Sequence, residues 1–283
     1  MSAAERPQAA AGDKRPGFPV RLSPNAGVPS ATKRIVGSNA SNASDAFKPM
    51  RPKHAVVGLQ KPVPAGVGLD SQTVRSRMVE KLAKQGLQDA AVLAAMGQVE
   101  RHRFVDTALA NQAYEDTSLP IGLGQTISKP NVVARMLELL REGKGKDERL
   151  GRVLEIGTGC GYQAAVLSHV ASEVYSIERL RGLHDKARDN LRHFRLANVH
   201  LLFGDGMEGF AKGAPYAAII AAAGGEAIPP AWIDQLAVGG RLVAPMQTAS
   251  GQQALVVIDK MAHGIRQAVL EVVHFVPLKS GTN

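Results

Sequence analysis

The chain has 283 residues, enough for one large domain or two small ones, and 45% of them are hydrophobic, enough for a globular core. No apolar run reaches membrane-spanning length and none follows the first arginines and alanines, which argues against a membrane anchor and a secretory signal. The single cysteine, Cys160, excludes an intrachain disulfide, so we expect a cytoplasmic protein.

The formal net charge of +9 is concentrated in one part of the chain. Residues 1–70 hold 10 of the 34 Lys/Arg residues but only 4 of the 25 Asp/Glu residues. The remaining chain is nearly balanced, which gives little support for a dedicated nucleic-acid surface. We therefore expect no nucleic-acid partner.

The same first 70 residues hold 9 of the 16 prolines and show no sustained helical or strand period. Such a segment buries too little apolar area to offset its ordering entropy, so we predict a disordered basic tail. The functional alternative is a basic tether for an acidic partner. We predict one folded domain over residues 71–283.

Within residues 71–150 we predict a mainly helical part on the substrate side. Apolar residues recur at helical spacing from Ser71 onward and are interrupted at Gly86. Residues 114–125 contain many turn residues and are predicted to form an ordered loop. Ser128 shortly before Pro130 is a helix-start signal, which predicts a helix from this point.

From residue 151 onward, short apolar runs alternate with helix-length segments. This alternation predicts an α/β fold with a doubly wound, mostly parallel, seven-stranded Rossmann-like sheet that carries the cofactor in residues 151–283. The last two strands are too close in sequence for a crossover helix, so the sheet should end with an antiparallel C-terminal strand. The predicted strands are residues 152–157, 173–178, 199–205, 216–223, 241–246, 253–260 and 269–278.

A glycine-rich turn follows the first of these strands. The stretch LEIGTGCGYQ places Gly157, Gly159 and Gly161 between a strand and a helix, where the backbone must turn sharply and a ligand must approach closely. A dinucleotide-binding fold needs its third glycine where Tyr162 stands. The observed G-x-G-x-G spacing is that of S-adenosylmethionine enzymes.

Two acids follow at the ends of the next strands. Glu178 ends the second strand, where a carboxylate can accept hydrogen bonds from both ribose hydroxyls. Asp205 and Gly206 end the third strand, where an acid can receive the adenine amino group. Each residue alone is also compatible with a purely structural turn or a chance acid, but the three features together favour an S-adenosylmethionine site.

Several other chemistries find no support. Residues 221–230 (AAAGGEAIPP) lack the Asn/Asp-Pro-Pro-aromatic motif common among amino-group methyltransferases. Methylation of the cytosine ring needs a Pro-Cys nucleophile, but the one cysteine lies in the glycine turn. The eight histidines show no paired metal spacing, so no metal site is predicted.

Residues 101–137 carry a more specific pattern, with Tyr-x-Asp, Leu-Pro-Ile-Gly and Gly-Gln-Thr-Ile-Ser elements in series. This segment closely resembles the N-terminal signature of protein-L-isoaspartate O-methyltransferases. The glycine turn, GDGMEGF and PPAWIDQLAVGGRLVAPM match further stretches in that family's order. The resemblance covers about residues 75–278.

The resemblance implies methyl transfer to the free carboxylate of L-isoaspartyl residues in damaged proteins, after which the ester collapses to succinimide. It implies that Ser128 is the active-site serine and that the three turn glycines, Glu178, Asp205 and Gly206 contact the cofactor. No general base is required because a carboxylate (reference pKa about 4) is already ionised near pH 7. From local sequence alone, Ser128 is also a candidate N-cap of the following helix.

The sequence departs from the family pattern at Gly225, where proline is common, and at Lys279, where a small or apolar residue is common. Both positions lie near the expected substrate cleft. The runner-up function is a methyltransferase acting on a small-molecule carboxyl or hydroxyl; a nucleic-acid-binding protein that uses its basic tail is a further alternative. We expect a monomer whose partners are isoaspartyl proteins and peptides.

Overall fold

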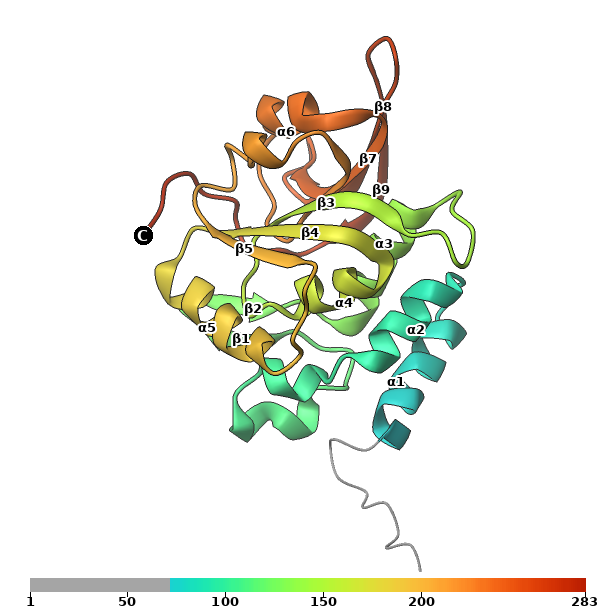
Figure 1. Ribbon diagram of the computed structural model, residues 1–283, viewed down its shortest axis with the longest axis vertical. Helices are drawn as coiled ribbons and strands as arrows, with labels where there is room; N and C mark the ends of the chain where they lie inside the picture. The colour runs from blue at the N-terminus through green and yellow to red at the C-terminus, as the bar shows by residue number, and fades with distance from the viewer. Residues whose placement is uncertain (1–71) are drawn as a thin grey trace, which may run out of the picture. The chain divides into compact units, whose positions relative to one another are not determined.

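The computed structural model describes residues 72–283, so the predicted tail over residues 1–70 lies outside the described part (Figure 1). A seven-stranded sheet forms the centre, in the order β5-β4-β3-β6-β7-β8-β9. The strands are β3 (Leu150–Ile156), β4 (Ala171–Glu178), β5 (Val199–Phe203), β6 (Tyr216–Ala221), β7 (Leu236–Gln247), β8 (Gln253–Lys260) and β9 (Ile265–Val273).

Strand directions confirm the predicted fold class. The five strands from β5 to β7 pair in parallel, whereas β8 is antiparallel to β7 and β9 is antiparallel to β8. A two-strand hairpin needs no crossover helix, which is why the short connections at the end of the sequence predicted this reversal. The order of the parallel strands reverses between β3 and β6, and open α/β sheets bind ligands at such a switch point.

Helices cover both faces of the sheet, unequally (Figure 1). Buried residues of α1 to α5 pack in one apolar cluster with one face of the sheet, and α6 packs through Trp232 on the other face. The helices are α1 (Gln72–Lys84), α2 (Ala90–Gln98), α3 (Pro130–Arg141), α4 (Tyr162–Val170), α5 (Arg181–Arg192) and α6 (Pro230–Gln235). Three short 3-10 segments complete the elements: η1 (Arg101–Phe104), η2 (Thr107–Gln112) and η3 (Ala211–Gly213).

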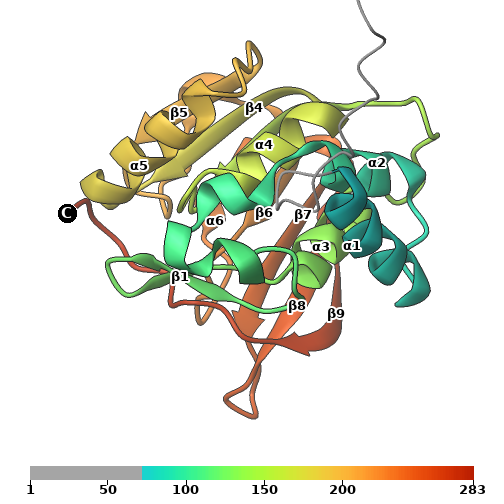
Figure 2. The same ribbon diagram turned by 90° about the horizontal axis from the view of Figure 1, so that it is seen from below.

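The segment predicted as a loop over residues 114–125 was assigned wrongly in part. Strands β1 (Leu119–Gly122) and β2 (Gln125–Ile127) form a separate antiparallel hairpin. Its strands are too short for a period of two to be recognised in the sequence. Figure 2 shows this hairpin on the same side of the molecule as the red C-terminal segment, and residues of both line one cavity.

Candidate active site

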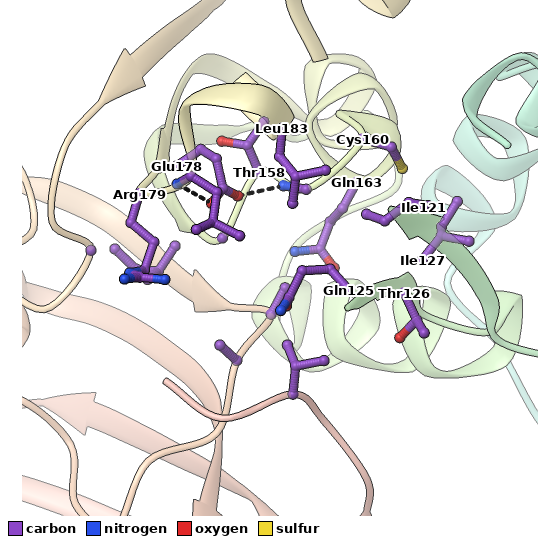
Figure 3. Close-up of a pocket in the computed structure, with 18 of the residues that line it drawn as sticks. Ile121, Gln125, Thr126, Ile127, Thr158, Cys160, Gln163, Glu178, Arg179 and Leu183 are labelled. Atoms are coloured by element: carbon purple, nitrogen blue, oxygen red, sulfur yellow. Dashed lines mark hydrogen bonds between the residues drawn. The ribbon is translucent and has the colours of Figure 1, made fainter. Parts of the chain in front are cut away.

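A cavity of about 290 Å³ lies at the carboxyl ends of β3 and β4 (Figure 3). Its walls come from the turn after β3, the residues after β4, the β1–β2 hairpin and residues 276–279. This is the edge of a parallel sheet at which ligands bind in open α/β folds. Of the predicted site residues, the cavity is lined by Ser128, Gly157, Gly159, Glu178 and Gly206.

The glycine turn has the backbone that its sequence predicts. Gly157, Gly159 and Gly161 have φ angles of 88°, 56° and 90°, the left-handed region in which a Cβ is strained. Gly161 does not line the cavity but precedes α4, and a Cβ there would lie 3.0 Å from Leu191 Cδ1. Gly161 therefore serves helix packing, while the other two leave the backbone open to a ligand.

Glu178 ties the two strand ends together. Its side chain is buried, and its carboxylate accepts hydrogen bonds from the N–H of Gly159 and of Leu180, both at 2.9 Å (Figure 3). Each carboxylate oxygen can accept a second hydrogen bond. Glu178 thus shapes the turn and can still accept hydrogen bonds from two hydroxyl groups of a ligand in the cavity.

Asp205 lies beside the cavity without lining it. Its carboxylate accepts the N–H of Met207 at 2.8 Å and the N–H of Gly281. Gly206 does line the cavity, and its carbonyl oxygen accepts a hydrogen bond from Trp232 Nε1 at 2.8 Å. The expected contact between Asp205 and adenine remains a prediction: each carboxylate oxygen already accepts one backbone N–H and can accept a second hydrogen bond.

Ser128 lies between β2 and α3, and its alternative role as N-cap is wrong. The N-cap of α3 is Lys129, which makes no side-chain cap, and Pro130 is the first helical residue. The N–H of Asn131 is satisfied at 2.9 Å by Asp116, a residue 15 positions earlier in the chain. Among residues 72–283, none hydrogen-bonds to the Ser128 hydroxyl, which leaves it available to a substrate.

A second cavity, of about 310 Å³, also has Ser128 in its wall. Lys129, Arg135 and His274 line it as well, and Arg135 is paired with Glu271 at 3.0 Å. Ser128 therefore lies in the walls of both cavities, the one beside the glycine turn and the one beside α3 and β9.

A buried network beneath the glycine turn was not predicted from the sequence. The hydroxyls of Thr158 and Ser176 lie 2.6 Å apart, and Ser176 donates to Glu155. Burial raises the pKa of Glu155 to about 8, despite hydrogen bonds that lower it, so this carboxyl is mainly protonated near neutral pH. The network supports Thr158, which lines the cavity, from below.

The hairpin is held over the cavity from α5. Lys186 Nζ donates to the Ile121 carbonyl at 2.8 Å. At the tip, Leu123 has a φ of 52° and approaches Gly182 so closely that a Cβ there would lie 3.1 Å from Leu123 Cδ1. No local sequence pattern indicates either contact, because the residues involved are about 60 positions apart.

The two departures from the family pattern have different positions. Lys279 lines the first cavity. Gly225 does not, but a Cβ there would lie 3.3 Å from Leu278 Cδ2, and Leu278 lines the cavity. A side chain at residue 225 would therefore press on the cavity wall through Leu278, and glycine leaves that space free.

Two classes of feature are missing from the described part of the chain. Residues 72–283 contain no group of three or more His, Cys, Asp or Glu side chains that could hold a metal ion. Over the same range, no helix is long and apolar enough to cross a membrane.

Comparison with known families gives a match over most of the chain. Residues 73–283 match the family model for protein-L-isoaspartate(D-aspartate) O-methyltransferase (PCMT). A protein-L-isoaspartate O-methyltransferase from Methylibium petroleiphilum is 55% identical over the whole of both chains, residues 1–71 included. A Leptothrix cholodnii protein of that name is 63% identical over 77% of this chain and 78% of its own.

Solved structures agree. A protein-L-isoaspartate O-methyltransferase superposes with a TM-score of 0.66 at 28% identity, over 73% of this chain and 66% of that one. A Plasmodium falciparum chain, described as a beta-aspartate methyltransferase (PCMT) in complex with S-adenosyl-L-homocysteine, gives 0.61 at 24% identity, over 72% of this chain and 98% of that one. At 24% identity, the similarity to the Plasmodium falciparum chain supports the fold alone.

Proposed function

The chain belongs to the protein-L-isoaspartate(D-aspartate) O-methyltransferase family, and we propose that the residues around the first cavity carry out that family's reaction. The enzyme transfers methyl from S-adenosylmethionine to the free carboxylate of L-isoaspartyl residues in damaged proteins. The observation that carries the assignment of residues is the position of Ser128, which faces both the cavity of the glycine turn and a second cavity.

The first cavity fits the cofactor. Its volume of about 290 Å³ lies just below the range of small-molecule sites, roughly 300–1,000 Å³. Gly157 and Gly159 present bare backbone to it, and Glu178 has capacity for two ribose hydroxyls. We assign Gly157, Gly159, Gly161, Glu178, Asp205 and Gly206 to the cofactor side, with Gly161 acting through the turn and Asp205 through the loop after β5.

When bound, S-adenosylmethionine supplies an electrophilic methyl group on its sulfonium. The protein must then align an already ionised carboxylate and exclude water, because no proton has to be removed from the acceptor. The Ser128 hydroxyl can donate to one carboxylate oxygen. The hairpin, held by Lys186, forms one wall of the cavity and would help to exclude water from it.

Cys160 is not part of this chemistry, although it lines the cavity. Its side chain is buried, and burial raises the pKa of the thiol, which keeps it in the weakly nucleophilic protonated form. The neutral thiol packs beside Tyr162 as a small apolar group.

We also propose the finer organisation that the sequence predicts. Residues 71–150 contribute Ser128 and the hairpin on the acceptor side, and residues 151–283 contribute the glycine turn and Glu178 on the cofactor side. We also propose a monomer that acts in the cytoplasm on proteins. The near-balanced charge of residues 71–283 supports protein substrates rather than nucleic acid.

The test is methyl incorporation into a matched pair of peptides that differ only in an L-isoaspartyl or an L-aspartyl residue. We expect labelling of the isoaspartyl peptide and none above background for its isomer. Equal labelling of the two peptides, or of neither, would refute the proposal. Small carboxylic acids in the same assay test the runner-up, which requires turnover without any peptide.

A further inference from the structure

One fully buried charge lies directly behind Ser128. Arg101 begins η1, and its relative exposure is 0%. Its Nη2 donates to the Ser128 carbonyl oxygen at 2.8 Å, and its Nε donates to the Ala113 carbonyl oxygen at 2.8 Å. The guanidinium thus holds the peptide of the active-site serine from a position 27 residues earlier in the chain.

The charge of Arg101 is not neutralised nearby. In the range 72–283, no carboxylate lies within ion-pair distance of its guanidinium, and Nη1 is buried without a partner of good hydrogen-bond geometry. The Tyr162 hydroxyl also interacts with the guanidinium but is a neutral group. Asp116 acts on it only from a distance and is already engaged with the N–H of Asn131. Burial lowers the pKa of Arg101, but an arginine in a protein keeps its proton, so the positive charge persists.

The groups between Arg101 and the first cavity are neutral. The guanidinium stacks 4.6 Å from the centre of the Tyr162 ring, and burial raises the pKa of this phenol to about 12. Burial also raises the pKa of the Cys160 thiol. Both side chains line the cavity and neither carries a negative charge. Glu178, a carboxylate that also lines the cavity, is held by the N–H groups of Gly159 and Leu180.

An unpaired buried charge costs stability, and a fold is stabilised equally well by an apolar side chain in such a place. The cost is offset when an anion binds close by, because attraction between charges is strong where water is excluded. The substrate class of this enzyme is an anion at the point where it reacts. The surroundings of Arg101 therefore fit a role in holding the acceptor better than a role in folding.

We propose that Arg101 is a positioning residue for the acceptor: it fixes the Ser128 peptide and places a permanent positive charge behind the docking point of the isoaspartyl carboxylate. This inference rests on the proposed function. In this proposal Arg101 contacts neither substrate nor cofactor. It acts through its hydrogen bond to the Ser128 carbonyl oxygen and through the electrostatic field of its positive charge.

The chain offers a matched control in Arg141, at the far end of α3. Arg141 is also buried (1% exposed), and it donates to the carbonyl oxygens of Glu148 and Gly145 as well as to Asp89. It lines neither of the two cavities that meet at Ser128. Arg101→Lys and Arg141→Lys each keep a positive charge but lose the planar fork that binds two carbonyl oxygens at once.

The experiment measures kcat and KM for the isoaspartyl peptide, cofactor Kd by calorimetry, and Tm for the full-length wild type and both variants. We expect Arg101→Lys to lower peptide kcat/KM about tenfold or more, mainly through KM, with cofactor Kd changed by less than about twofold. Arg141→Lys should lower Tm with nearly unchanged kinetics. If the kinetics of Arg101→Lys match those of Arg141→Lys, or if its cofactor affinity falls in step with turnover, the inference is wrong.

A second measurement needs no variant and remains decisive if Arg101→Lys does not fold. In ¹⁵N-labelled wild-type protein saturated with S-adenosylhomocysteine, the isoaspartyl peptide should shift the Arg101 Nε–H resonance and leave that of Arg141 in place. No shift at Arg101, or equal shifts at both, would overturn the inference. Absence of methylation by the wild type would instead refute the proposed function, which separates the two failures.

Discussion

The two sides that we propose for the cavity, a cofactor side and an acceptor side, are built differently. On the cofactor side, the turn after β3 is held by contacts between consecutive elements: Glu178 binds Gly159, 19 residues away, and Ser176 binds Glu155, 21 residues away. On the acceptor side, the hairpin is held from α5, 65 residues later in the chain. The peptide of Ser128 is held by a buried arginine 27 residues earlier.

This difference has a consequence for specificity and for mutation. The cofactor side is formed by a single strand–turn–helix–strand unit. Enzymes that act on many different acceptors can share such a unit. The acceptor side depends on contacts that exist only in the complete fold. Substitutions on the cofactor side should therefore act on cofactor affinity, and those on the acceptor side on peptide turnover.

The largest expected effect tests the acceptor side. Ser128→Asp places a negative charge against an anionic substrate and should lower kcat/KM for the isoaspartyl peptide by about a hundredfold or more. Ser128→Ala removes one donor and should lower it by about tenfold. Because Lys129 and not Ser128 is the N-cap of α3, neither change should alter the free energy of unfolding by more than about 0.5 kcal/mol.

Ser118→Asp is the matched control for Ser128→Asp. Ser118 is exposed and lines only the second of the two cavities that Ser128 joins. The negative charge introduced by Ser118→Asp should change peptide turnover much less than the one introduced by Ser128→Asp. Full activity of a stable Ser128→Asp enzyme would remove Ser128 from the mechanism and leave the backbone amides nearby as the carboxylate contacts.

A smaller effect tests the cofactor side. Glu178→Ala removes a charged acceptor of two hydroxyls and should weaken binding of S-adenosylhomocysteine by about 1–3 kcal/mol in calorimetry. Glu173→Ala is the control, since Glu173 lies on the same strand but is 42% exposed and paired with Arg152 at the opposite end. Unchanged affinity of Glu178→Ala with an intact fold would exclude the ribose contact.

The sequence predicted the backbone of the proposed cofactor side for a physical reason, while the cofactor contacts themselves stay a prediction. Strand patterns, left-handed glycines and an acid at a strand end are local features, and the observed strands and φ angles confirm them. Glu178 is the last residue of β4, as its pattern indicates. The role of Asp205 remains a prediction, since Asp205 lies beside the cavity without lining it.

The acceptor side was predicted only through the family resemblance. Local sequence suggested that Ser128 is an N-cap, but Asp116 satisfies the N–H of Asn131 instead. Arg101 stands in the run Arg-His-Arg, which has the composition of a solvated surface, and yet it is fully buried. Burial of a charge depends on contacts from distant segments, which no local pattern records.

The smallest expected effect tests the link between the two sides. Lys186 extends from α5 to the Ile121 carbonyl of the hairpin, so it connects the cofactor side to the acceptor side. Lys186→Met keeps an unbranched side chain but loses this hydrogen bond, and we expect cofactor affinity and peptide kcat/KM both to fall about two- to tenfold. Arg188→Met, an exposed change on the same helix, should alter neither. If Lys186→Met changed peptide turnover alone, the hairpin would serve only the acceptor. No change in either quantity would show that contact between Leu123 and Gly182 suffices to hold the hairpin, and the two sides of the site would then be independent.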